Sequence, residues 1–443
     1  MIRLHPAARV AGVVAALLAC AFPVAGAESG WAVDMSGGHT DNARRTETGR
    51  VSDTILTAGV AATFKEQTRR LKASIEGSGT WFDYLDDTYD DDFLASGQAE
   101  LVFGVVPDRF LWSVEDTLRQ IAVDLTQPVT PENRQSANVF RTGPDFIFRL
   151  SDRSEVTLGS RFTKTAYEET TRIDDTQISG ELRWLRRVSS ATAWGAVASH
   201  QHVEYDAPED PAYEQQELYG TLQSDGARQA IRLDIGATRL SGDAGSGTST
   251  NPLLRVSLSR QLRRTLVLGL NFGSEYRNSS DRFSRDSLVV APGPERVVLS
   301  AVPAQARFGD VKLSLTRPRT SVDIGASYSR EKPVAGPGFE ERLWRLSAGA
   351  SRSLRPTLRG FVNYGYEDRQ LKFTELQADQ TQVASLGLDW RVGRSTFITV
   401  GYRREDREGT LGTGTYVDNL FQLRVAYRNG ALAETDGQGP GGF

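Results

Sequence analysis

An alternation of apolar and polar residues near the end of the chain limits its fold most strongly. Two alternating segments occupy Thr396 to Tyr427, separated by a polar loop from Glu405 to Tyr416. The apolar positions are Ile398, Val400 and Tyr402 on the first segment and Phe421, Leu423, Val425 and Tyr427 on the second. A period of two places alternate side chains on opposite faces of a β-strand. Strands that are apolar on one face, polar on the other and aromatic at their ends are typical of a transmembrane β-barrel.

The same hairpin recurs along the rest of the chain. Nine short turns alternate with ten longer loops, which predicts about twenty strands. Weak alternation near Asn138 to Leu150 and near Gln305 to Thr316 leaves eighteen strands as an alternative. The sheet must close on itself, because an open edge would leave backbone groups unpaired in hydrocarbon. The predicted fold is therefore all-β: a closed antiparallel transmembrane β-barrel of 18–20 strands, with short periplasmic turns and longer extracellular loops.

The first 27 residues have the features of a secretory signal peptide. Arg3 and Arg9 precede or flank an apolar core, and Ala25-Gly26-Ala27 is a small-residue cleavage site. A lipoprotein site that ends at Cys20 is the alternative. Cleavage after Ala27 would remove the only cysteine, which excludes disulfides and thiol catalysis. The expected organisation is signal peptide 1–27, barrel 28–428 and flexible C-terminal tail 429–443.

Composition agrees with an exported barrel. No segment after the signal peptide approaches the roughly 18 apolar residues of a membrane helix. The mean hydropathy of −0.38 fits strands that show only half of their residues to lipid. The formal charge of −4 argues against nucleic acid as a partner. These features predict location in the outer membrane of a Gram-negative cell, with outer-membrane lipids, lipopolysaccharide and the barrel-assembly machinery as partners.

Charged and amide residues of both signs fall on the face that would line the lumen. The mixture predicts a hydrated wall with local ion pairs, not a filter of one sign. Two roles are open for such a wall. It could do no more than solvate the interior of the barrel, or it could form a polar path for a carbohydrate. A barrel this wide keeps an aqueous lumen unless a loop fills it, and Arg277 to Pro303 and Arg330 to Glu341 are long enough to project outward or fold inward. The candidate lumen-facing residues are Arg161, Arg232, Asp234, Asn271, Glu275, Arg359, Asn363, Arg403 and Arg424, with Asp323, Arg345 and Asp389 on the same register.

Three patterns could carry chemistry. The acidic loop Asp83 to Asp92 could hold Ca²⁺, but it lacks the EF-hand spacing and equally suits a solvated loop. His200 and His202 share a strand face without a third ligand at a recognisable spacing. Ser199 and His200 are adjacent in a strand, so they point to opposite faces and cannot act as nucleophile and base. We therefore expect no catalytic residue, no metal, no cofactor and no enzymatic activity.

One part of the chain resembles a known group of proteins. The motifs are Thr40-Asp41-Asn42, Val105 to Trp112 followed by Asp116 and Gln120, Thr130 to Arg134, and Thr142 to Phe146. They resemble outer-membrane β-barrel proteins associated with exopolysaccharide and PEP-CTERM sorting loci, mainly over the first third of the chain. The resemblance implies a channel or scaffold for exopolysaccharide export, with polysaccharide and export-system proteins as further partners. A general or substrate-specific uptake porin and an outer-membrane barrel enzyme are the alternatives.

Overall fold

The computed structural model describes residues 27–207, 209–210, 212–242, 247–278, 280–281, 288, 296–297, 299–334, 339–372, 376–410 and 414–434. Residues 1–26 of the predicted signal peptide and 435–443 of the predicted tail lie outside these residues. The strands are β1 (Glu28–Thr40), β2 (Asp53–Gln67), β3 (Leu71–Tyr84), β4 (Asp92–Val106), β5 (Phe110–Ala122), β6 (Arg134–Ser151), β7 (Ser154–Tyr167), β8 (Asp175–Arg187), β9 (Thr192–Tyr205), β10 (Tyr213–Asp225), β11 (Gln229–Gly242), β12 (Ser249–Arg263), β13 (Leu266–Arg277), β14 (Ala304–Arg317), β15 (Thr320–Pro333), β16 (Glu340–Arg355), β17 (Leu358–Lys372), β18 (Leu376–Arg391), β19 (Thr396–Gly409) and β20 (Tyr416–Gly430).

These strands form one closed antiparallel sheet of 20 strands. Each strand pairs with the next along the chain, and β20 pairs with β1 from Gly30 opposite Gly430 to Thr40 opposite Leu420. Closure satisfies the backbone groups that an edge strand would leave unpaired. The predicted fold is confirmed at the higher strand count, because the two weakly alternating segments form β6 and β14.

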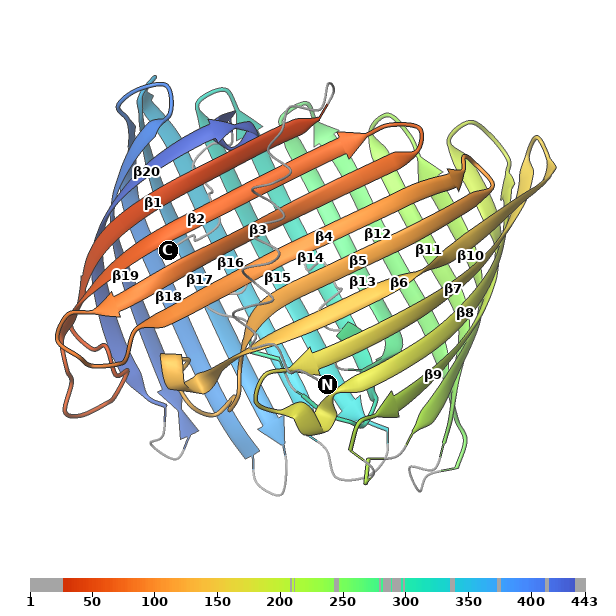
Figure 1. The fold of residues 1–443 in the computed structure, drawn as a ribbon, viewed down its shortest axis with the longest axis horizontal. Coiled ribbons are helices and arrows are strands. Elements are labelled where there is room, and N and C mark those ends of the chain that lie inside the picture. The colour runs from red at the N-terminus through yellow and green to blue at the C-terminus, as the bar shows by residue number, and fades with distance from the viewer. Residues whose placement is uncertain are drawn as a thin grey trace.

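The short turns lie at one end of the barrel and the long loops at the other (Figure 1). The first residues of β1 and the last residues of β20 lie together at the short-turn end. The predicted loop from Glu405 to Tyr416 is too long: β19 continues to Gly409, because the alternation persists through its charged residues. Glu405 and Arg407 are therefore inward-facing wall residues and not loop residues.

Aromatic pairs surround the outer surface near both ends of the strands. At the short-turn end Trp31 stacks on Tyr427, and Trp184 meets Trp194 edge to face. At the long-loop end Tyr402 packs against Phe421. Between these belts the outer surface consists mainly of exposed apolar side chains. This arrangement matches the two interfaces and the hydrocarbon layer that a transmembrane barrel crosses.

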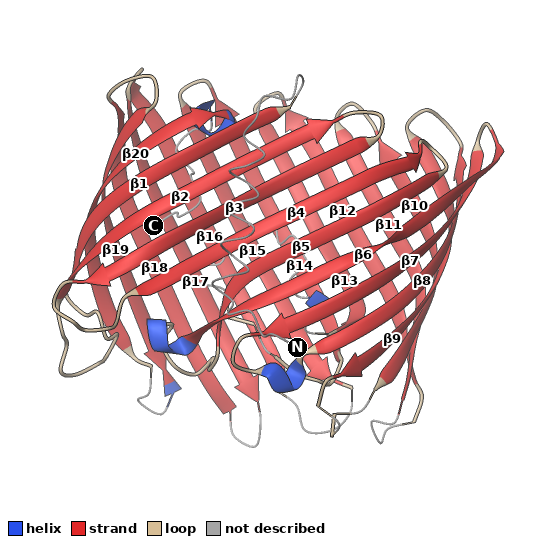
Figure 2. Ribbon diagram, viewed as in Figure 1, coloured by secondary structure: helices blue, strands red, loops and turns tan. Residues whose placement is uncertain are grey.

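Among the described residues, helical structure is confined to short segments next to the strands (Figure 2). The 3₁₀ turns η1 (Pro131–Asn133) and η2 (Thr171–Ile173) belong to loops at the long-loop end. The helix α3 (Ala431–Glu434) follows β20 at the short-turn end, where Gly430 adopts a positive φ of 60°. A side chain at this glycine would collide with the carbonyl of Ser29, so the reversal of the chain requires glycine. No helix in the described part of the chain is long and apolar enough to cross a membrane.

Candidate functional site

The loop between β13 and β14 folds into the lumen and contacts opposite walls. Val297 joins a buried apolar cluster with Ile121, Ala137, Val139 and Tyr167 of strands β5 to β7. The adjacent Arg296 forms ion pairs with residues of β17 and β18. In a ring of twenty strands β6 and β17 are nine strands apart one way and eleven the other, so they face each other across the barrel. This loop therefore spans the lumen in its long-loop half.

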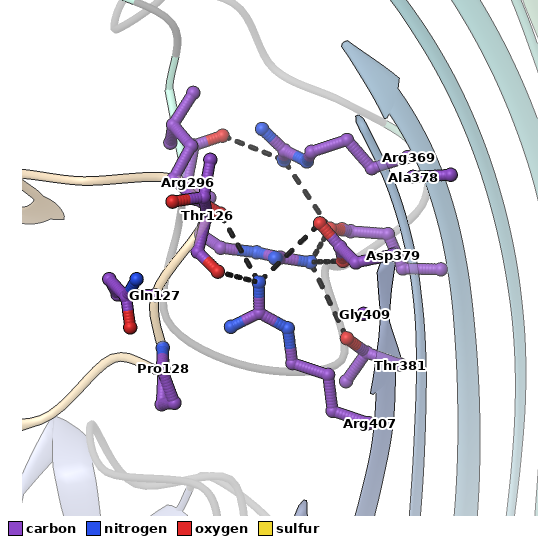
Figure 3. A network of polar contacts seen from close by, with 12 residues as sticks. Thr126, Gln127, Pro128, Arg296, Arg369, Ala378, Asp379, Thr381, Arg407 and Gly409 are labelled. Carbon is purple, nitrogen blue, oxygen red and sulfur yellow. Dashed lines mark hydrogen bonds and ion pairs between the residues drawn. The ribbon is translucent and has the colours of Figure 1, made fainter. Parts of the chain in front are cut away.

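Arg296 is the charged anchor of this loop. Its guanidinium lies 2.5 Å from Glu367 Oε1 and 2.8 Å from Asp379 Oδ1. Arg369, which is fully buried, donates a hydrogen bond to the carbonyl of Arg296 at 2.8 Å. Figure 3 shows Arg296 and Arg407 approaching Asp379 from different sides. A buried ion pair of this kind is costly to disrupt, because the remaining partner becomes an uncompensated charge.

The loop between β5 and β6 also turns into the lumen. Arg407 on β19, six strands away from β5, donates hydrogen bonds to the carbonyls of Thr126 at 3.0 Å and Leu125 at 3.3 Å. Asn133 fixes the shape of the loop by accepting from the Asp124 amide and donating to the Asp124 carbonyl. Hydrogen bonds within the β5–β6 loop and from Arg407 therefore hold it in a defined position inside the lumen.

A single carboxylate connects the two inward loops. Asp379 on β18 lies 2.8 Å from Arg296 of the β13–β14 loop and 3.5 Å from Arg407, which holds the β5–β6 loop. A third loop, between β1 and β2, adds Arg45, which donates to the carbonyl of Val129 at 2.6 Å. We call Arg296, Glu367, Arg369, Asp379 and Arg407 the loop-anchoring network.

The charges of the loop residues depend on their buried surroundings. Burial alone would lower the pKa of Arg296, but Glu367 and Asp379 raise that pKa above its usual range, so its guanidinium stays charged. The pKa of Arg45 is also raised, because Glu405, Tyr416 and Asp418 together outweigh the lowering by burial. Burial raises the pKa of the Asp281 carboxyl, which lies in the first turn of the β13–β14 loop. The arginines thus hold the loops in place, whereas ionised Asp281 opposes docking.

The short-turn half of the lumen encloses a polar cavity of about 1090 Å³. Five predicted lumen residues line it, namely Asp323, Arg359, Asn363, Asp389 and Arg424. Leu288 of the β13–β14 loop and Leu432 of α3 also border the cavity. The wall is mixed in sign, since Arg424 pairs with Asp34 at 2.8 Å. Hydroxyl, amide and paired charged groups of this kind suit hydrophilic solutes better than one class of ion.

The remaining predicted lumen residues face inward but do not line this cavity. Arg403 pairs with Glu405 at 2.5 Å beside the β5–β6 loop. Arg161 pairs with Asp145 at 2.6 Å, and Glu275 pairs with Arg255 and Arg277 at 2.5 Å each. Asp234 is buried opposite Thr221, and Arg232 and Asn271 lie on the inward registers of β11 and β13. The sequence treats these residues as one continuous lumen wall. In the structure they belong to separate ion pairs and contacts at different places on that wall.

None of the five residues of the loop-anchoring network is among the predicted lumen residues, for two reasons. Glu367 and Arg369 continue the inward register of Arg359 and Asn363, so a longer reading of the alternation could have found them. Arg296 lies in a loop without periodicity, and nothing in the sequence indicates that it reaches β17 and β18. The motif residues quoted for the family resemblance include Asn133, which here builds the β5–β6 loop.

The other candidate sites do not assemble. His200 and His202 are exposed on the outer face of β9, whereas Ser199 belongs to its inner face. The backbone amides of Asp86 and Thr88 in the acidic loop donate hydrogen bonds to the side-chain carboxylate of Asp53. This carboxylate therefore holds the loop in position. Among the described residues there is no group of three or more His, Cys, Asp or Glu that could hold a metal ion.

Comparison with known proteins finds similarity only in structure. No protein-family model and no curated protein matches the sequence. A mutant of the ferric enterobactin receptor PfeA from Pseudomonas aeruginosa is 9% identical, with 92% of this chain and 81% of that chain covered and a TM-score of 0.48. The FrpB iron transporter from Neisseria meningitidis is 9% identical over 90% of this chain and 81% of that chain, with a TM-score of 0.45. The copper transporter OprC is 12% identical over 92% and 81%, with a TM-score of 0.43.

Proposed function

We propose that this protein is an outer-membrane channel for hydrophilic solutes whose extracellular half is narrowed by inward-folded loops. The observation that carries the proposal is the position of Arg296 and Val297, which join opposite walls of the barrel. A scaffold would have no need for a hydrated cavity behind such a constriction. The mixed polar wall around Arg359, Asn363 and Arg424 supports a neutral or zwitterionic polar solute.

The proposal makes the barrel a channel and not an enzyme. Ser199 and His200 lie on opposite faces of β9, which removes the one serine–histidine combination that the sequence offered. The outward apolar belt supports contact with outer-membrane lipids and lipopolysaccharide, and insertion by the barrel-assembly machinery follows from the same location. No cofactor has a part in this function.

Export of exopolysaccharide is the second candidate, and the resemblance of the first third of the chain favours it. A polymer would need the β5–β6 and β13–β14 loops to leave the lumen while it passes. Uptake of a small solute needs only a gap beside them. The two candidates therefore differ in how far the loops must move.

The channel is tested by conductance in planar bilayers. The R296Q variant removes the charge that holds the β13–β14 loop against β17 and β18. We expect a larger single-channel conductance or a larger open fraction than in wild type, with unchanged folding of the barrel. R404Q is the matched control, because Arg404 is an exposed outward arginine paired with Asp406. Equal conductance of wild type and R296Q would show that this loop does not limit flow.

The direction of transport is tested in cells. Deletion of the gene should reduce uptake of small polar solutes if the barrel is a porin, whereas it should reduce secreted polymer if the barrel exports exopolysaccharide. A strain that carries R296Q separates the two further. It should increase permeability to small solutes under the first candidate and leave polymer secretion as in wild type.

A further inference from the structure

We infer that the outer surface of strands β14 to β16 binds the phosphate groups of a membrane glycolipid. Three arginines form a row across these strands: Arg307 lies directly opposite Arg330, and Arg330 lies directly opposite Arg342. They occupy the outward register, since the alternate residues Glu331 and Glu341 are buried toward the lumen. The inference concerns the outer surface and depends on the transmembrane placement of the barrel, not on the proposed channel activity.

The row contains more positive than negative charge. Directly opposed like charges destabilise a sheet pair unless an anion lies between them. The carboxylate of Glu340 serves both neighbours through the same oxygen, at 2.7 Å from Arg330 and 3.2 Å from Arg342. Within the part of the chain that the structure describes, Arg307 makes no ion pair, and Lys332 is a further exposed cation on the outward register of β15. Four cations and one carboxylate leave a local charge of +3 that an external anion would neutralise.

The row lies at the height of lipid headgroups. One step nearer the middle of the barrel, Tyr328 lies opposite Trp344, with ring centroids 4.6 Å apart. Below this pair, Ile324 and Leu346 are exposed apolar side chains. Tyrosine and tryptophan mark the membrane interface, so the adjacent guanidinium groups lie just outside the hydrocarbon. Phosphate esters of lipids occupy the same level.

A lipid phosphate fits the row better than a free phosphate ion. The planar guanidinium group donates two parallel hydrogen bonds to phosphate oxygens, which makes arginine the preferred residue for this contact. A glycolipid would also lay its acyl chains on Ile324 and Leu346, whereas an inorganic ion would gain nothing from that surface. The row lies on strands next to long loops, so the glycolipid belongs to the extracellular leaflet.

Binding is measured with the full-length barrel in detergent micelles. The probes are lipid A that carries two phosphates, the same lipid A after enzymatic removal of both phosphates, and inorganic phosphate as a competitor. The test variant is R307Q/R330Q/R342Q. The matched control is K164Q/R239Q/R404Q, which removes three outward charges from strands β7, β11 and β19, where no two of them lie opposite each other.

We expect the test variant to bind bisphosphorylated lipid A about a hundredfold more weakly than wild type, and the control variant to bind it nearly as wild type does. E340Q removes the competing carboxylate and should strengthen binding. If the triple variant fails to assemble, R342Q alone should weaken binding by about fivefold. The inference is overturned by equal binding of the dephosphorylated lipid, by an equal loss in the control, or by displacement with millimolar inorganic phosphate. An acidic protein that binds the row in preference to lipid A would overturn it as well.

Discussion

At the residue scale, Asp379 has more effect than its position in a wall strand suggests. Its carboxylate faces Arg296 and Arg407, and these two arginines hold different loops. Because Asp379 is buried, its negative charge is screened little by water and acts strongly on both guanidinium groups. Loss of this one charge should therefore loosen two segments that are distant in sequence.

We predict that D379N increases conductance and couples to R296Q. Breaking a buried ion pair costs about 3–5 kcal/mol, although Glu367 still holds Arg296 and reduces the cost here. The two substitutions remove the same contact, so the double variant should show less than the sum of the single effects. Single-channel recording of the four proteins in the cycle measures this. Strict additivity would mean that Asp379 and Arg296 act independently.

The facing of strand residues could be predicted from the sequence, but the positions of loop residues could not. Alternation predicts that Arg359, Asn363 and Arg424 face inward, because a strand with a period of two fixes the facing of every residue. In the structure these three residues line one cavity. Alternation could not place Arg296, because the conformation of a loop depends on contacts with distant strands. Glu405 and Arg407 were assigned to a loop, since charged residues at the end of β19 hid its inward register.

At the element scale, the β13–β14 loop has a built-in response to pH. Asp281 lies in its first turn, where its side chain accepts from the Asn278 amide at 3.1 Å. Burial raises the pKa of Asp281, Glu275 adds to the rise, and Arg141 and Arg277 oppose it. A carboxyl whose pKa is raised by docking penalises the docked loop when it is ionised. Docking should therefore strengthen as the pH falls from neutral toward the raised pKa.

We predict that channel conductance decreases as the pH falls from neutral toward the raised pKa of Asp281 and this carboxyl takes up a proton. Bilayer recordings across this range measure the profile. The D281N variant lacks the charge at every pH, so its conductance should be low at pH 7 and should change little as the pH falls. A wild-type profile retained in D281N would assign the pH response to another group.

Loop positions were the least predictable elements for a physical reason. Strand positions follow from local alternation, and the two alternating segments between Thr396 and Tyr427 correspond to β19 and β20. The sequence of Arg277 to Pro303 left projection and inward folding equally open. The inward fold depends on Val297 meeting Ile121 and Tyr167, which lie more than a hundred residues earlier in the chain. Only the closed barrel brings them together.

At the scale of the whole molecule, the orientation in the membrane is the first consequence to test. Short turns at one end and long loops at the other predict that the turns face the periplasm. A peptide tag inserted after Gly409, beside the β19–β20 loop, should be labelled on intact cells. Tags in the turns at Gly226 and Gly393 should be labelled only after the outer membrane is permeabilised. Surface labelling at Gly226 would reverse the orientation.

The assignment of the two faces of the wall is tested by neighbouring residues of β13. Leu270 faces outward between Leu258 and Val311, near the middle of the strand, whereas Leu268 lies closer to the turn and is a weaker probe. An arginine on the lipid face near the membrane midplane costs about 2–4 kcal/mol, so L270R should reduce the heat-modifiable, membrane-inserted fraction.

N271R is the matched comparison for L270R, because it introduces the same side chain one position further along β13. Asn271 faces the lumen opposite Asp310, where an added guanidinium group has water and a carboxylate within reach. We therefore expect N271R to assemble as wild type does. Strand register, side-chain size and charge are the same in both variants, so a difference in assembly reports only the solvent on each face. Equal assembly of the two variants would mean that lipid and water do not lie on the sides assigned here.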